Sequence, residues 1–226
     1  MTETVRPLRR DAQRNRERII EAAREVFAAR GFAATLDDVA HHAAVGVGTV
    51  YRRFPTKEAL IEAVFADRLE DLVSLAEDAL ALPSAWDGLT MLLRRTARMH
   101  CGDRGLRDAA LCIGIDKHHF ARVGEHMVPL IGELIDRAHA EGTLRPDVGL
   151  QDFPIIMAMI TDLARHAGDT RPAIHERYLE LIIDGLKAQP GNGDLGPAVT
   201  QADLEAIVED CVPPIEARRP GANRPS

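Results

Sequence analysis

Aromatic residues are scarce in this sequence, at 4% of the 226-residue chain, and valine and isoleucine rarely stand side by side. β-Strands are rich in these residue types, so few strands are expected. Alanine, leucine, arginine and glutamate dominate instead, and all four favour helices. The composition therefore predicts an all-α protein, and its 46% apolar content is enough for a continuous core.

Cysteines and long apolar runs are also scarce. Cys101, Cys112 and Cys211 form no CxxC pair and are odd in number, which argues against a zinc site or a disulfide framework. No apolar run approaches the ~20 residues that span a bilayer. The N-terminus is rich in arginine but lacks the apolar stretch of a signal peptide. We expect a cytoplasmic protein that needs no metal or other cofactor and has no membrane partner.

The net charge of −7 is distributed unevenly along the chain. Residues 1–65 carry a net charge of +2, whereas residues 66–226 carry −9. The first 20 residues hold six arginines and only three acidic residues, the arginines being Arg6, Arg9, Arg10, Arg14, Arg16 and Arg18. Such a basic arm suits contacts with DNA phosphates. Disordered basic tails without that role are also common.

The N-terminal region has the pattern of three helices. Residues 11–30 place apolar side chains at helical spacing. A short helix over 35–43 begins with a threonine, and Asp38 is placed to complete a capping box. A third helix over 47–54 is stopped by Pro55, because a residue before proline is driven out of the α region. Two short helices joined by a tight turn and supported by a longer one predict a helix-turn-helix.

The segments TLDDVA at 35–40 and GVGTVYRRFPTKEAL at 46–60 resemble the TetR family of transcriptional repressors. The resemblance implies N-terminal helices that bind a palindromic operator in double-stranded DNA, and a divergent remainder that binds an inducer and forms a homodimer. It implies phosphate contacts from Thr35, Thr49, Tyr51 and Lys57. It also implies that Val47, Gly48, Arg52 and Arg53 reach base edges or the backbone. The sequence departs from the family at Ala44, where glycine is usual; a left-handed alanine there costs ~1 kcal/mol.

The rest of the chain is punctuated by glycine and proline into further helices. Thr56 can cap a helix that continues to Pro83, about 40 Å long, which links the DNA reader to the remainder. Five more helices are expected over 84–101, 105–118, 124–141, 149–167 and 171–188. The total of about nine matches the architecture that the resemblance implies.

The expected domain organisation follows from this punctuation. Residues 1–55 form the DNA-binding domain and residues 56–188 a larger helical domain for ligand binding and dimerisation. Residues 189–226 are expected to be a flexible linker, a possible short helix at 200–211 and a disordered tail.

The helices at 149–167 and 171–188 carry apolar stripes. By resemblance they would pair with their copies in a four-helix dimer interface made of Phe153, Ile156, Met157, Ile160, Leu163, Leu179, Ile182, Ile183 and Leu186. Ordinary intrachain core is the alternative, because an apolar stripe cannot by itself distinguish the two. A palindromic operator favours the dimer, since it needs a two-fold protein.

Large or soft side chains are the candidates for a ligand cavity, because methionine in particular adapts to irregular shapes. They are Trp86, Met91, Met99, Cys112, Phe120, Met127 and Met159. Each is also typical of an ordinary core. Asp116, in the run DKHH at 116–119, and the pair Asp162 and His166 add polar groups that can orient a ligand or chelate a metal. Nine histidines make chance pairs common, so no metal site is expected.

These features predict a ligand-responsive repressor that a small-molecule inducer releases from DNA. A DNA-binding activator or a constitutive nucleoid-associated protein would use the same reader. A metal-dependent enzyme is the alternative from another class, but the sequence has no HExxH, no GxSxG and no glycine-rich phosphate loop. We therefore do not expect an enzyme.

Overall fold

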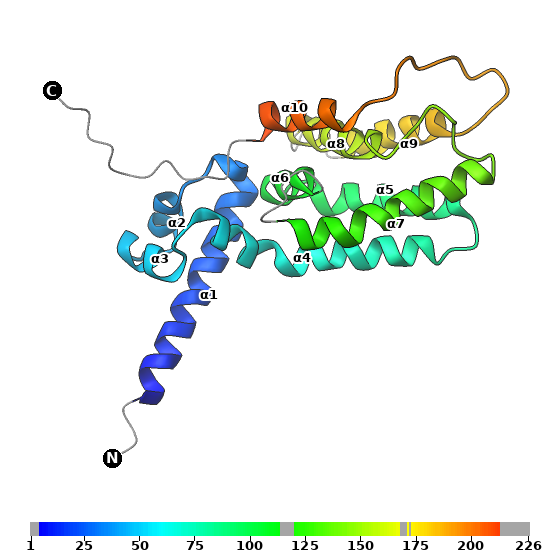
Figure 1. Cartoon of the computed structure of the whole chain (residues 1–226). Helices are drawn as coiled ribbons and strands as arrows, with labels where there is room; N and C mark the ends of the chain where they lie inside the picture. Colours follow the sequence, from blue (N-terminus) through cyan, green and yellow to red (C-terminus); the bar gives the residue numbers. More distant parts are fainter. Residues whose placement is uncertain (1–4, 114–119, 168–170, 172, 213–226) are drawn as a thin grey trace.

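The computed structural model describes residues 5–113, 120–167, 171 and 173–212, and this part of the chain is all helical (Figure 1). The helices are α1 (Val5–Arg30), α2 (Leu36–His42), α3 (Val47–Arg53), α4 (Lys57–Leu80), α5 (Ala85–His100), α6 (Arg104–Cys112), α7 (Ala121–Ala140), α8 (Asp152–Ala167), α9 (Ile174–Leu186) and α10 (Gln201–Cys211), with a 3-10 turn, η1 (Gly31–Ala33), after α1. The predicted fold class is confirmed.

The predicted helix caps are present. The Thr35 hydroxyl accepts a hydrogen bond from the Asp38 N–H at 3.1 Å, and the Asp38 carboxylate accepts from the Thr35 N–H at 2.8 Å. This reciprocal pair is the capping box expected for α2. At the start of α4 the Thr56 hydroxyl accepts from the Ala59 N–H at 3.2 Å. The threonine caps thus fix where α2 and α4, the helices on either side of α3, begin.

The turn between α2 and α3 has the left-handed residue that the sequence implied. Ala44 has φ 50°, and no other non-glycine residue of the described chain has a positive φ. The Val45 N–H bonds to the Ala40 carbonyl at 3.0 Å and the Ala44 N–H to the His41 carbonyl at 3.1 Å. These two bonds form a Schellman motif, which closes α2 and turns the chain toward α3.

Several helices differ in length from their predictions; α9, for example, spans Ile174–Leu186 instead of 171–188. α1 begins at Val5, six residues before the predicted start, so the arginine-rich segment continues the helix away from the body of the molecule (Figure 1). α6 ends at Cys112, whereas the prediction continued to residue 118. Residues 114–119 lie outside the described chain.

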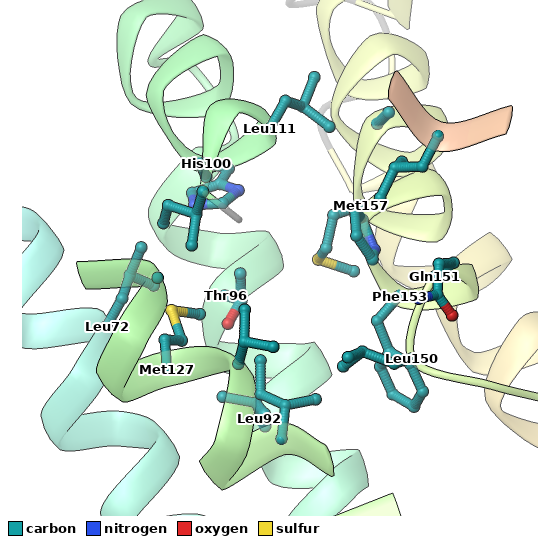
Figure 2. A pocket seen from close by; sticks show the side chains of 18 of the residues that line it. Leu72, Leu92, Thr96, His100, Leu111, Met127, Leu150, Gln151, Phe153 and Met157 are labelled. Atoms are coloured by element: carbon teal, nitrogen blue, oxygen red, sulfur yellow. The ribbon is translucent and has the colours of Figure 1, made fainter. Parts of the chain in front are cut away.

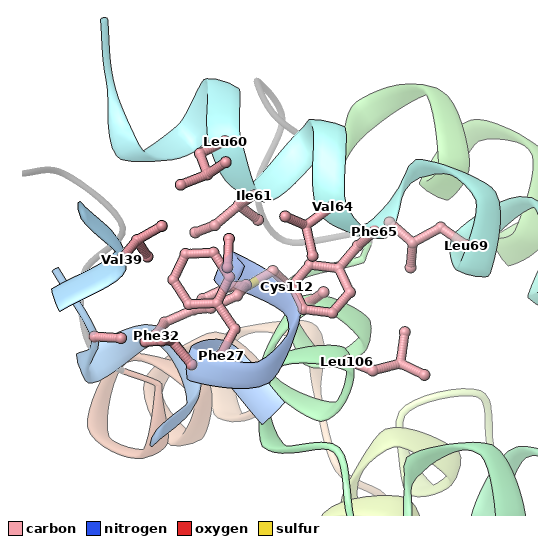
Figure 3. Close-up of a cluster of buried hydrophobic side chains, with 14 of the residues drawn as sticks. Phe27, Phe32, Val39, Leu60, Ile61, Val64, Phe65, Leu69, Leu106 and Cys112 are labelled. Atoms are coloured by element: carbon pink, nitrogen blue, oxygen red, sulfur yellow. The ribbon is translucent and has the colours of Figure 1, made fainter. Parts of the chain in front are cut away.

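The buried side chains form two clusters. The first joins α1, η1, α2, α3 and α4 with α6, around three phenylalanine rings, Phe27, Phe32 and Phe65, whose centroids lie 6.2–6.4 Å apart (Figure 3). The second fills the bundle of α4, α5, α7, α8 and α9. α4 contributes to both clusters, and the first crosses the boundary expected after residue 55. The DNA reader is therefore packed directly on the helical domain.

The segment expected as a linker, residues 189–194, has contacts with the bundle. The Arg145 guanidinium donates to the Gly193 carbonyl and pairs with Asp147 at 2.9 Å, and Asp147 accepts from the Leu195 N–H at 3.2 Å. The chain then enters α10, whose Leu204 and Val208 are buried in the first cluster. The C-terminal segment thus lies along the bundle and returns to α6 and α8 (Figure 1).

Candidate DNA-binding face and ligand cavity

Helix α3 presents the edge that the sequence predicts. Val47, Arg52 and Arg53 are exposed, and a side chain built on Gly48 would meet no atom within 4 Å. Thr49 and Tyr51 are half-buried, and the Thr49 hydroxyl accepts from the Arg52 guanidinium at 3.3 Å. Val50 between them is fully buried and fixes the helix to the core. The structure therefore brings six of the eight predicted DNA-contacting residues onto one helix.

The other two predicted residues, Thr35 and Lys57, lie elsewhere. Thr35 is exposed at the start of α2, with its hydroxyl in the capping box. Lys57 is buried, and its ammonium donates to the Phe32 carbonyl. Burial lowers the pKa of Lys57, while the charges of nearby acids oppose this shift. The predicted phosphate contact of Lys57 is therefore corrected, because the protein itself holds this ammonium group.

The arginines of α1 have different surroundings. Arg18 donates to the Ala43 carbonyl at 2.7 Å and thereby supports the turn after α2. The Arg16 guanidinium lies 5.6 Å from the centroid of the Phe54 ring. Arg14 is exposed. Arg18 is exposed as well, although its guanidinium is held by its hydrogen bond to the Ala43 carbonyl. The side chains of Arg6, Arg9 and Arg10 lie outside the described part of the chain.

A cavity of about 300 Å³ lies inside the helical domain (Figure 2). This volume falls at the lower end of the range for small-molecule sites, about 300–1,000 Å³. Helices α4 to α8 and α10 contribute to it, and most of the wall is apolar. Six of these apolar residues are Leu72, Leu92, Leu111, Met127, Phe153 and Met157. A site of this kind selects a largely apolar molecule.

Five polar side chains among the described residues line the cavity: Thr96, His100, Arg107, Gln151 and Gln201. Thr96 and His100 stand one turn apart on α5, and Arg107 comes from α6. Neither the Thr96 hydroxyl nor the two ring nitrogens of His100 have a hydrogen-bond partner among the described residues. Burial, helped by the charges of Arg68 and Arg107, lowers the pKa of His100 to about 4. The imidazole is therefore neutral near pH 7.

Of the ten residues predicted to bind the ligand, Met127 alone appears in the cavity wall. Trp86, Met91 and Met99 are half-buried against the cores, and Cys112 and Phe120 are buried in the first cluster. Met159 is exposed on α8, and Asp116 lies outside the described residues. Asp162 and His166 do pair, at 3.3 Å, but on the surface. Of the described candidates, side-chain size and softness therefore placed Met127 alone on this cavity wall.

A signal for the true lining was present in the sequence. Thr96 and His100 interrupt the apolar stripe of α5, which includes Leu89, Leu92 and Leu93. A polar side chain on a buried helical face is unusual, because it must find a partner or lose hydrogen bonds.

Metal ligands do not converge in the described chain: no group of three or more histidine, cysteine or acidic residues there could hold an ion. The run at 116–119, which the sequence offered as a metal-binding candidate, lies outside that part of the chain. No helix among the described residues is long and apolar enough to cross a membrane.

The residues predicted for the dimer interface are core residues of the single chain. Seven of the nine are buried in the second cluster, and Leu163 and Ile182 are half-buried. Phe153 and Met157 even line the cavity. The prediction is corrected for the seven buried residues, because the chain's own bundle helices cover them, while Leu163 and Ile182 are covered only in part. The large apolar side chains exposed on α8 and α9 are Met159, Tyr178 and Leu181, which are 58%, 44% and 65% exposed.

Comparisons with known proteins match both parts of the chain. Residues 19–64 match the model "Bacterial regulatory proteins, tetR family", and residues 85–188 match "Transcriptional regulator SbtR-like, C-terminal domain". The TetR transcriptional regulator SCO0520 from Streptomyces coelicolor is 31% identical; the match covers 77% of this chain and 99% of that one, with a TM-score of 0.49.

One further relative and one solved structure of similar fold match most of the chain. The HTH-type transcriptional regulator SrpR of Pseudomonas putida is 26% identical over 160 residues, which are 68% of this chain and 75% of the relative. The crystal structure of the transcriptional regulator FadR from Bacillus subtilis in complex with stearoyl-CoA is 18% identical, with a TM-score of 0.54, and the match covers 75% of this chain and 98% of that one.

Proposed function

Because the chain belongs to the TetR family of bacterial regulatory proteins, we propose that it is a repressor that a small molecule releases from its operator. The models and relatives that establish the membership are transcriptional regulators, not enzymes. One observation carries the proposal: the chain combines an exposed helix-turn-helix edge with a mostly apolar cavity, and α4 and α6 pack against both. The protein would act in the cytoplasm, where the chromosome lies.

Helix α3 is the proposed recognition helix. Its seven residues enter the major groove, where Arg52 and Arg53 reach base edges or phosphates and Gly48 allows close approach. Thr35, Thr49 and Tyr51 contact the phosphates on either side. A palindromic operator places two copies of α3 in successive major grooves, about 34–36 Å apart.

The proposed homodimer uses the outer faces of α8 and α9. Met159, Tyr178 and Leu181 are exposed there, on the side opposite the buried stripe. Large apolar residues gathered on one surface are typical of a protein interface. Two helices from each copy would form the four-helix contact that the two-fold operator requires.

A chain of polar contacts supports a route from the cavity to the reader. Arg107 lines the cavity and pairs with Asp108 at 2.7 Å. The other oxygen of Asp108 accepts the Phe32 N–H at 2.8 Å, and Lys57 donates to the Phe32 carbonyl. A ligand that shifts α6 therefore moves the peptide that precedes α2. Typical coupling of about 1–3 kcal/mol weakens DNA binding about 5- to 150-fold.

The ligand part of the proposal has support from fold likeness alone. FadR from Bacillus subtilis has a similar fold and was crystallised with stearoyl-CoA. The present cavity is mostly apolar and has a volume of about 300 Å³, which suits a smaller apolar effector.

Selection of binding sites from random DNA duplexes tests the function. We expect enrichment of one sequence with two-fold symmetry. Arg52→Ala should lose about 1–3 kcal/mol of affinity for it, because an exposed α3 arginine contacts DNA. Arg95→Ala, which removes an exposed arginine from α5, is the matched control and should bind as tightly as the wild type. Absence of an enriched sequence, or equal losses in both variants, would rule out the proposed reader.

A further inference from the structure

Two neighbouring polar side chains on the cavity wall have no partner in the described chain. Thr96 is 7% exposed and His100 is 4% exposed, and both line the cavity from successive turns of α5. Figure 2 shows them on the same wall, across the cavity from Phe153 and Met157. The Thr96 hydroxyl and both imidazole nitrogens lack hydrogen bonds to any described residue. An unsatisfied buried polar group costs free energy that a bound molecule can recover.

The charge balance of the cavity argues against an ionic ligand. Arg107 is the one lining residue with a permanent charge among the described residues. Its guanidinium donates twice to one oxygen of Asp108, at 2.7 and 3.1 Å, so its charge is compensated within the protein. The remaining wall is mostly apolar, and an ion loses its hydration there without replacement.

The type of polar group follows from the two side chains. A neutral imidazole has one donor and one acceptor nitrogen, and a threonine hydroxyl both donates and accepts. Burial and the nearby arginines lower the pKa of His100 to about 4, which keeps the ring neutral at pH 7. A hydroxyl group matches this pair, because it donates to one side chain while it accepts from the other. A carbonyl only accepts, so it can pair only with the protonated ring nitrogen, whereas a hydroxyl can pair with whichever ring nitrogen faces it.

Starting from the proposed function of the cavity as an effector site, we infer that the effector is an uncharged, largely apolar molecule whose hydroxyl group hydrogen-bonds to Thr96 and His100. The apolar wall holds its body, and the two side chains of α5 recognise its polar end.

Three naphthalene derivatives test this ligand class on the full chain by isothermal titration calorimetry at pH 7.5. Naphthalene offers the apolar body alone, 2-naphthol adds the hydroxyl and 2-naphthoate adds a charge. We expect 2-naphthol to bind at least about ten-fold more tightly than either of the others, since it gains two hydrogen bonds of ordinary strength. A purely apolar cavity would instead prefer naphthalene. Equal affinities, tighter naphthoate binding, or no naphthol binding at millimolar concentration would overturn the inference.

Substitutions of Thr96 and His100 test whether these two side chains bind the hydroxyl group of the ligand. Thr96→Val and His100→Leu keep the side-chain volume and remove an unpaired polar group, so both should fold. In the double variant the preference for 2-naphthol over naphthalene should disappear. Thr90→Val is the control, because Thr90 is buried on the same helix, donates to the Asp87 carbonyl and does not line the cavity. A preference that survives in the double variant would contradict the assigned residues.

The ligand class and the proposed repression can fail separately. Calorimetry measures the ligand preference without DNA, so it tests the assignment of Thr96 and His100 alone. If 2-naphthol binds as expected and the DNA affinity does not change, the ligand class stands and the proposed release mechanism fails.

Discussion

At the residue scale, Ala44 occupies a conformation that its side chain disfavours. It lies at φ 50° in the Schellman motif that ends α2, where glycine has no Cβ to clash. The sequence predicted this strain from the resemblance, and the backbone confirms it. The turn sits directly before the DNA-reading helix, so its stability bears on the position of α3.

Ala44→Gly should therefore raise the free energy of unfolding by about 1 kcal/mol. Urea denaturation measures it. The matched control is Ala29→Gly, at an exposed position within α1, where glycine should lower stability by roughly 0.5–1 kcal/mol. A loss of stability in both variants would show that the left-handed turn is not strained.

His100 gives a pH dependence with a definite sign. Its pKa falls from 6.5 to about 4 on folding, so between these values the unfolded chain binds more protons than the folded chain. Stability is thus full above pH 6.5 and is lost as the pH falls toward 4. From pH 7.5 to 5.0 the loss from this group is about 2 kcal/mol. The free energies of unfolding of the wild type and of His100→Leu, measured by urea denaturation, should diverge by this amount between the two pH values. Parallel pH profiles would contradict the buried neutral imidazole.

At the element scale, local signals predicted where helices begin but not what covers them. Thr35 and Thr56 placed the starts of α2 and α4, because capping is decided within four residues of sequence. The stripe of α8 has the same 3.6-residue period whether another copy or the chain's own bundle covers it. The sequence therefore predicted a dimer interface from residues that the structure buries in the core. It likewise predicted that Met159, which is exposed, lines the cavity.

Most of the residues that line the cavity were also not predictable from local sequence patterns. Met91 and Met99 lie on α5 with Thr96 and His100 but do not line the cavity. Composition identifies side chains that can line a cavity, but the rotation of each helix decides which of them do. That rotation depends on long-range packing, which one sequence does not reveal.

Helix α6 approaches α1 and α4 closely at Gly105. A Cβ there would lie 2.5 Å from Phe65 Cζ and 2.8 Å from Phe27 Cβ. Gly105→Ala should force the helices apart and lower stability by about 1–3 kcal/mol, as overpacking does. Gly132→Ala in α7 is the control: its Cβ would meet nothing within 4 Å, so it should raise stability by about 0.5–1 kcal/mol. Thermal unfolding compares the two, and a neutral Gly105→Ala would refute the close contact.

At the scale of the whole molecule, two cores share α4, and the cavity lies beside the helices that support the reader. Arg107, Asp108 and the Phe32 peptide join the cavity to the turn before α2. Binding at one site and DNA contact at the other are thus parts of one packed body.

The proposed dimer surface predicts the behaviour of a single substitution. Leu181→Glu places a charge at an exposed apolar position of α9 and should convert a dimer into a 24.8 kDa monomer in sedimentation equilibrium. Leu195→Glu changes a similarly exposed leucine outside α8 and α9 and should remain dimeric. A monomeric wild type, or a dimer that tolerates Leu181→Glu, would place the two-fold contact elsewhere.

The central claim is that occupation of the cavity weakens DNA binding. The direct measurement is the fluorescence anisotropy of a labelled operator duplex, titrated with protein at fixed salt, with and without saturating 2-naphthol. The account predicts a Kd for DNA that rises about 5- to 150-fold in the wild type and is unchanged in the Thr96→Val, His100→Leu double variant. An unchanged Kd in wild-type protein that calorimetry shows to be saturated with 2-naphthol would contradict it.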